Sequence, residues 1–160
     1  TVTGLLIGVA VAAEIVAFYF AGRILGRFRL GHLLAVCYGL TALRWLIVAY
    51  LGDQPLVLAA SMLLHAGSFA IAHSGAMQFI QQFFPKAQRG RGQAFYAGII
   101  YGGGGAIGAY IAGISWRDGA GASATFTLAA LAAAIAMLLA LSLPRTMPRA
   151  DDKAANVNTP

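Results

Sequence analysis

Charged residues are scarce in this chain, and acidic ones are scarcer still. Of 160 residues, 10% are charged and 59% are hydrophobic, and only five are Asp or Glu. A soluble domain of this size could not cover so much apolar side-chain surface with so few polar groups. The composition therefore excludes a soluble globular protein and predicts an integral membrane protein that has the lipid bilayer as its partner.

Cysteine and the usual catalytic patterns are also nearly absent. The single cysteine, Cys37, excludes an internal disulfide, and there is no CxxC, HExxH or Cys/His spacing for a metal. Ser74 next to His73 is not a nucleophile–base pair, because neighbours on a helix point about 100° apart. We expect no metal, no cofactor and no enzymatic activity.

The formal net charge of +6 does not indicate a nucleic-acid partner. The basic residues separate apolar runs and form no continuous face, so the charge is better explained by membrane topology. We expect no binding of nucleic acid.

The hydrophobic runs predict an all-α, polytopic transmembrane helical bundle. A helix needs roughly 20 apolar residues to cross the hydrocarbon core, and the chain offers about five such stretches. The predicted spans lie near Val2 to Phe20, Gly31 to Leu51, Pro55 to Phe83, Ala94 to Ser115 and Ser123 to Leu143. The connections are too short for a soluble domain, and residues 144–160 are predicted to be a disordered cytoplasmic tail.

Lysine and arginine flank the spans on one predicted side. They cluster in three segments: Arg23, Arg27 and Arg29; Lys86, Arg89 and Arg91; Arg145, Arg149 and Lys153. By the positive-inside rule this side is cytoplasmic, which places the amino end outside and the carboxyl end inside. The odd number of spans and the start at Thr1, without a signal peptide, predict a fragment whose amino-terminal half is missing.

Three ionisable residues lie deep inside predicted spans. Glu14 and His65 fall near mid-depth, and Arg44 lies in the outer half of its span. Such groups mark ion or substrate pathways, although each also has a structural interpretation: a locked ion pair for Glu14, snorkelling for Arg44 and simple packing for His65. We expect Glu14 to exchange protons and Arg44 to be its fixed counter-charge or that of an anionic substrate.

Two further groups of residues are candidates for gating and helix packing. His73 lies nearer the cytoplasm, rotated from the stripe of Ser61, His65 and Ser68, and would act at a gate or only pack. In the fourth span, Gly103, Gly105 and Gly108 match GxGxxG, but an apolar helix without a preceding strand is not a dinucleotide site. Small-xxx-small faces are the better explanation, for close and sliding helix packing. They are formed by Gly98 with Gly102 and by Gly104 with Gly108.

Several segments together resemble the carboxyl-terminal half of the major facilitator superfamily, in its phenylpropionate-permease and nucleoside:proton-symporter-like branch. They are VAAEIVAFYF around Glu14, the pair Arg44–Trp45, LLHAGSFAIAHSGAMQFI from Leu63 to Ile80, and GQAFYAGIIYGGGGAIGAYIAG from Gly92 to Gly113. The resemblance covers about Val2 to Pro144. It implies that the five spans are helices eight to twelve of a twelve-helix transporter in a bacterial inner membrane.

The resemblance also implies roles for single residues. Glu14, Arg44 and His65 are similar to the acid, arginine and histidine of lactose-permease-type symporters, but Ser68 stands where those carry a second acid. The segment Ala21 to His32, with Arg23 and Arg27, is similar to the basic gating loop of the superfamily, with Gly26 in place of the usual aspartate.

We therefore expect proton-coupled transport of a small organic solute, such as an aromatic acid, a nucleoside or a sugar-like compound. For an aromatic acid, Arg44 would hold the carboxylate, and Trp45, Phe69 or Tyr101 would offer a ring face. The alternative is a non-transporting scaffold or receptor in which the polar residues serve helix packing.

Overall fold

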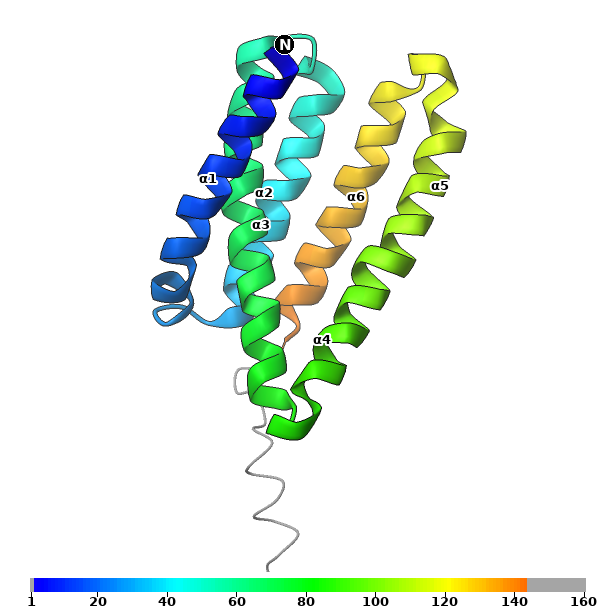
Figure 1. The fold of residues 1–160 in the computed structure, drawn as a ribbon. Coiled ribbons are helices and arrows are strands. Elements are labelled where there is room, and N and C mark those ends of the chain that lie inside the picture. The colour runs from blue at the N-terminus through cyan, green and yellow to red at the C-terminus, as the bar shows by residue number, and fades with distance from the viewer. Residues whose placement is uncertain (1, 144–160) are drawn as a thin grey trace, which may run out of the picture.

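The computed structural model describes residues 2–143, and the predicted tail at 144–160 lies outside them. The described residues form an all-helical structure (Figure 1), with five helices long and apolar enough to cross a membrane. The all-α class and the prediction of about five spans are confirmed.

Three single helices open the chain: α1 (Val2–Leu25), α2 (Leu30–Leu51) and α3 (Pro55–Phe83). The fourth crossing combines α4 (Arg89–Ala97), a π-helical segment η2 (Gly98–Gly104) and α5 (Gly105–Trp116). The last helix is α6 (Ala122–Leu141), and single 3₁₀ turns, η1 (Lys86–Gln88) and η3 (Arg117–Gly119), precede α4 and α6.

Two connections are shorter than the hydropathy pattern predicts. Helix α1 continues past Phe20 to Leu25, and α4 begins at Arg89 instead of Ala94. Apolarity ends where the hydrocarbon ends, whereas a helix continues until its backbone is interrupted. The interruption after α3 comes from Pro85, since the preceding Phe84 adopts the extended conformation that a following proline favours.

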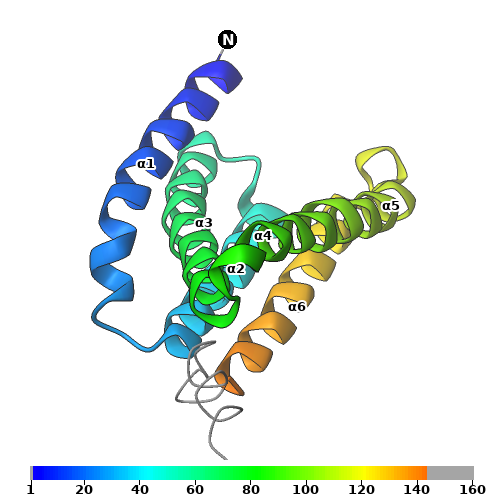
Figure 2. The ribbon, with the colours of Figure 1, turned by 60° about the horizontal axis from the view of Figure 1, so that its bottom comes forward.

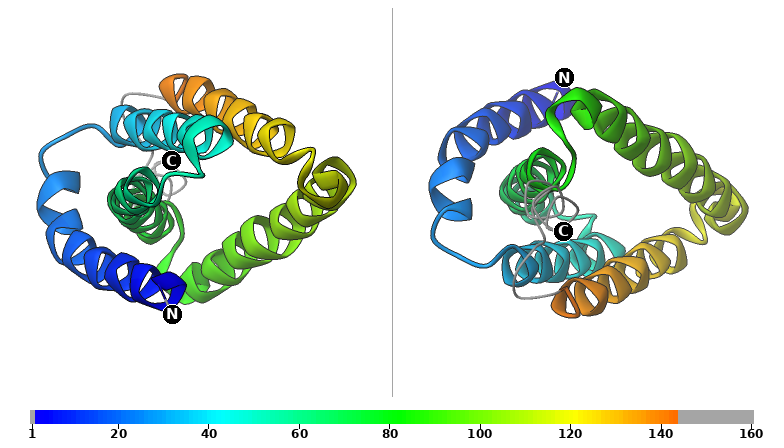
Figure 3. Two further views of the ribbon diagram at one scale, coloured as in Figure 1. Left: turned by 90° about the horizontal axis from the view of Figure 1, so that it is seen from above. Right: turned by 90° about the horizontal axis from the view of Figure 1, so that it is seen from below.

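Helix α3 lies in the middle of the bundle, with α1 packed on one side and α2 on the other (Figure 3). Helix α2 packs most extensively against α6. The first part of the fourth crossing, α4, contacts α3, and its last part, α5, contacts α6. Between these contacts the crossing leans away from the bundle (Figure 2). As a result, α3 is the helix on which side chains from three different elements converge.

Small residues form the buried contacts between these helices. Among the described residues, the buried apolar positions are almost all alanines, such as Ala66, Ala70 and Ala130, together with Cys37 and Ile80. Many large apolar side chains face outward instead, as expected where lipid is the solvent. Cys37 is a free thiol buried among these small residues.

One glycine is required by a close helix approach. A Cβ atom at Gly31 of α2 would lie 2.9 Å from the carbonyl oxygen of Ala140 in α6 and 3.3 Å from Cβ of Leu143. The glycines predicted to pack in the fourth crossing differ. A Cβ atom at Gly98, Gly102 or Gly108 would meet nothing within 4 Å, so no described helix packs on that face.

We predict that Gly31→Ala destabilises the protein, because the new methyl group forces α2 and α6 apart. Overpacking of this kind costs about 1–3 kcal/mol, and the loss is measurable as a lower unfolding temperature in detergent. Gly113→Ala is the matched control, since a Cβ atom there meets nothing within 4 Å. Equal melting temperatures for Gly31→Ala and the native protein would show that the helices do not approach this closely.

Candidate functional site

An acid from α1 meets a histidine from α3 inside the bundle. The Nε2 atom of His65 lies 3.8 Å from Oε1 of Glu14, and the two side chains are 37% and 26% exposed. Glu14 falls near the middle of α1. Within residues 2–143 this is the one acid–base pair closer than 4.0 Å, so the structure brings together two of the three predicted proton-coupling residues.

Arg44, the third predicted residue, has a different partner from the one expected. Its side chain is buried, with only 7% exposed, and its Nε donates a hydrogen bond to the carbonyl oxygen of Ser61 at 3.1 Å. Its guanidinium carbon also lies 4.4 Å from the centre of the Trp45 ring. The expected pairing with Glu14 is absent because α3 lies between α1 and α2, so the two side chains reach α3 from opposite sides.

Trp45 belongs to a second aromatic group, on the α2–α6 side of the bundle. Its ring stacks on Phe126 of α6 at 5.4 Å, and Trp116 contacts the same Phe126 edge-on at 6.0 Å. The predicted substrate-binding rings therefore do not form one set. Arg44 and Trp45 lie together on this side, whereas Phe69 stacks on His65 and Tyr101 contacts His73.

A row of stacked rings runs along α3 from His65 toward the basic end. His65 stacks on Phe69 at 5.4 Å, and Phe69 stacks on His73 at 5.8 Å. Phe18 of α1 contacts both Phe69 and His73 edge-on. His73, predicted to be rotated from the stripe of Ser61, His65 and Ser68, is thus linked to His65 through the Phe69 ring. The three ring residues on α3 are four positions apart, and this i, i+4 spacing is the signal that could have revealed the row.

The fourth crossing joins the row through two tyrosines. The Tyr101 hydroxyl lies 3.2 Å from Nδ1 of His73, and Tyr96 contacts His73 edge-on at 5.9 Å. Tyr101 belongs to the π-helical segment, and such segments are frequent at functional sites. Sequence reasoning found Tyr101 but did not single out Phe18 or Tyr96, although Phe18 lies one helical turn after Glu14.

Ser68, at the position where similar symporters carry an acid, points toward its own helix. Its hydroxyl donates to the carbonyl oxygen of Leu64 at 2.8 Å and is 3.2 Å from that of His65. The Thr41 hydroxyl on α2 lies 3.5 Å away and completes the contact. Ser68 is buried on the α2 side of α3, so it is not part of the Glu14–His65 pair.

The basic residues of the predicted gating loop contact aromatic rings or remain exposed. The Arg23 guanidinium lies over the Tyr19 and Phe20 rings of its own helix, at 5.6 and 5.5 Å. Arg27 is exposed in the connection after α1. In the part of the chain that the structure describes, neither arginine has an acidic partner within 4.0 Å.

We predict that Tyr101→Phe changes the tautomer of His73 without changing the fold. A tyrosine hydroxyl that donates to Nδ1 favours the tautomer with its proton on Nε2, and phenylalanine removes that donor. Nitrogen NMR of the labelled histidines measures the ratio of tautomers. Tyr110→Phe, at a tyrosine of α5 that is 71% exposed, is the control. An unchanged His73 spectrum in Tyr101→Phe would show that the two side chains do not interact.

Comparison with known proteins identifies the family. Residues 1–128 match the family described as MFS_1 like. Searches of the curated proteins and of the solved structures gave no match. The matched segment holds Glu14, Arg44 and His65, the aromatic row and both tyrosines of the fourth crossing. It spans more than half of the chain, and the protein therefore belongs to the MFS_1 like family, whose members are secondary transporters and not enzymes.

Proposed function

We propose that this secondary transporter is coupled to protons and that Glu14 and His65 form its proton site. The observation that carries the proposal is their 3.8 Å contact near mid-depth, where both side chains are partly exposed. A charged group at this depth is costly unless it is paired or faces a water-filled cavity. The pair meets this requirement and leaves the proton site accessible.

Charge balance supplies the coupling. When Glu14 is ionised and His65 is neutral, the charge of Glu14 offsets that of Arg44 across α3. One added proton leaves an excess positive charge in the membrane, which favours a conformation that hydrates it or an anionic substrate that neutralises it. Proton binding therefore changes the relative energies of the inward- and outward-open states, as alternating access requires.

The aromatic row is the proposed contact for the transported solute. Phe69 stacks on His65 of the proton site, and Tyr101 reaches the same row at His73, so substrate and proton would occupy neighbouring parts of one row. The solute would be a small organic compound such as an aromatic acid, a nucleoside or a sugar-like molecule. Arg44 and Trp45 lie on the other side of α3 and are proposed to hold α2 against α3 and α6.

We also propose a place and an orientation for this chain within the complete transporter. The five crossings would form part of a carboxyl-terminal half in the phenylpropionate-permease and nucleoside:proton-symporter-like branch, rocking against an amino-terminal half of the same protein. The end of α1, the start of α4 and the connections after α1 and α3 lie at one end of the bundle (Figure 1), and together they carry most of the described lysine and arginine residues. This end would face the cytoplasm of a bacterial inner membrane.

We predict that Glu14→Gln abolishes proton-driven accumulation by the complete protein in liposomes. One pH unit is about 1.4 kcal/mol, so one coupled proton supports roughly a tenfold accumulation ratio across a one-unit gradient. In Glu14→Gln the ratio should fall to about one, while exchange of labelled substrate without a gradient persists. Labelled phenylpropionate and a labelled nucleoside serve as probes. Asp53→Asn, at an exposed loop acid, is the control, and unchanged accumulation in Glu14→Gln would refute proton coupling at this site.

We predict that Arg44→Lys lowers stability without selectively weakening binding of the acidic probe. Lysine keeps the charge but loses the Nε donor to Ser61 and the planar stack on Trp45. Loss of a hydrogen bond to a charged group costs about 1.5–3 kcal/mol, which thermal unfolding detects. If Arg44 instead held the substrate carboxylate, the KM for phenylpropionate would rise while that for the nucleoside and the melting temperature stayed unchanged. Arg117→Lys, in the exposed turn before α6, is the control.

A further inference from the structure

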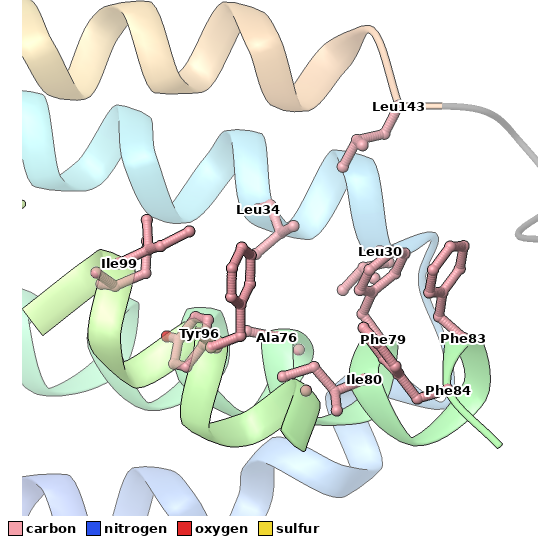
Figure 4. Close-up of a pocket in the computed structure, with 14 residues that line it drawn as sticks. Leu30, Leu34, Ala76, Phe79, Ile80, Phe83, Phe84, Tyr96, Ile99 and Leu143 are labelled. Atoms are coloured by element: carbon pink, nitrogen blue, oxygen red, sulfur yellow. The ribbon is translucent and has the colours of Figure 1, made fainter. Parts of the chain in front are cut away.

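A cavity of about 440 Å³ lies at the basic end of the bundle, away from the proton site. It is bounded by the start of α2, the end of α3, and the α4 and η2 segments of the fourth crossing (Figure 4). Leu34, Phe79, Ile80 and Ile99 line its walls, and Leu143 after α6 lies at its edge. Its volume falls within the range of roughly 300–1,000 Å³ that is typical of ligand sites.

The side chains that line this cavity are hydrocarbon with one exception. The only lining side chain with a polar group is that of Tyr96, whose ring contacts His73 and Tyr101 in the aromatic row. Sites for polar solutes carry a few polar groups that orient the ligand. A hydrogen-bonding substrate would lose its water here without gaining partners, so the cavity fits an alkyl chain better than a polar solute.

Basic residues flank this cavity along the chain. Arg29 directly precedes the lining residue Leu30, and Lys86, Arg89 and Arg91 lie between the lining residues Phe84 and Phe95. Arg89 is held at the cavity edge, because its Nε donates to the carbonyl oxygen of Phe84 at 3.4 Å. The charged groups thus lie at the helix ends, and the hydrocarbon cavity lies between the helices.

No acid of the described residues neutralises these cations. Within residues 2–143 the acids are Glu14, Asp53 and Asp118. Glu14 pairs with His65 in the middle of α1, and the other two lie in the connections at the opposite end of the bundle (Figure 1). Within residues 2–143, no acidic side chain lies beside the cavity at this end of the bundle, and an added anion would find these cations without an acidic partner there.

We propose that this cavity binds one acyl chain of an anionic phospholipid, with its phosphate headgroup on Arg89 and the neighbouring basic residues. An alkyl chain satisfies the apolar walls, and a phosphate supplies the missing negative charge. A phospholipid carries both groups in one molecule. Its phosphate is joined to its alkyl chains, just as the basic residues of the site lie next to the apolar cavity. This inference is independent of proton coupling and of the transported solute.

The test is native mass spectrometry of the complete protein in detergent with equal amounts of phosphatidylglycerol and phosphatidylcholine. The native protein should retain the anionic lipid in preference to the neutral one. Arg89→Gln should weaken that retention roughly fivefold, the effect of one basic residue beside an anionic headgroup. Ala76→Phe should abolish it, because Ala76 lines the cavity and the larger ring fills it.

Two matched variants distinguish binding at this site from a general attraction of anionic lipids to the positively charged end of the bundle. Arg23→Gln removes a charge at the same end of the bundle, and Ala60→Phe adds a ring at an exposed position of α3 outside the lining. Both should retain the anionic lipid. Equal retention of both lipids, an equal effect of Arg23→Gln and Arg89→Gln, or undiminished retention in Ala76→Phe would each overturn the proposal. If Ala76→Phe does not fold, the comparison of Arg89→Gln with Arg23→Gln decides alone.

Discussion

Inside a membrane, a polar group must find its partner within the protein, and in this structure α3 provides most of those partners. Its Ser61 carbonyl accepts the hydrogen bond from Arg44 of α2, its His65 meets Glu14 of α1, and its His73 lies beside the Tyr101 hydroxyl of the fourth crossing. Three other elements thus make polar contacts with this one helix. The central position of α3 follows from this arrangement as much as from its alanine-rich packing surfaces.

The elements were predictable because their signals are local. Apolar runs of sufficient length, Pro55 at the start of α3 and Pro85 after its end place the helices within a few residues. Depth was also predictable, since helical rise along α1 puts Glu14 near its middle. Neither the position of a helix in the sequence nor the depth of a residue specifies which helices are neighbours. Glu14 and Arg44 therefore looked like natural partners until the structure placed α3 between them.

The aromatic row shows the same division between local and non-local information. Its α3 members repeat every fourth residue, and that spacing alone places His65, Phe69 and His73 along one side of the helix. The contributions of Phe18 and Tyr96 depend on how α1 and α4 pack, which no pattern within either helix encodes. The π-helical segment was not predictable either. Its glycines indicate a permissive backbone but do not select the wider hydrogen-bond pattern that carries Tyr101.

The way charges are balanced separates the two functional regions of the molecule. Glu14, His65 and Arg44 find their partners within the protein, so their state depends on protons and on the packing of α3. Within residues 2–143, the cations after α1 and α3 have no acidic partner within 4.0 Å, and we propose that a lipid headgroup provides one. Under the two proposals above, a change of pH would act first on the inner region, and a change of lipid headgroup would act first on the outer one. Because the aromatic row ends at Tyr96, which also lines the apolar cavity, the two regions share one side chain.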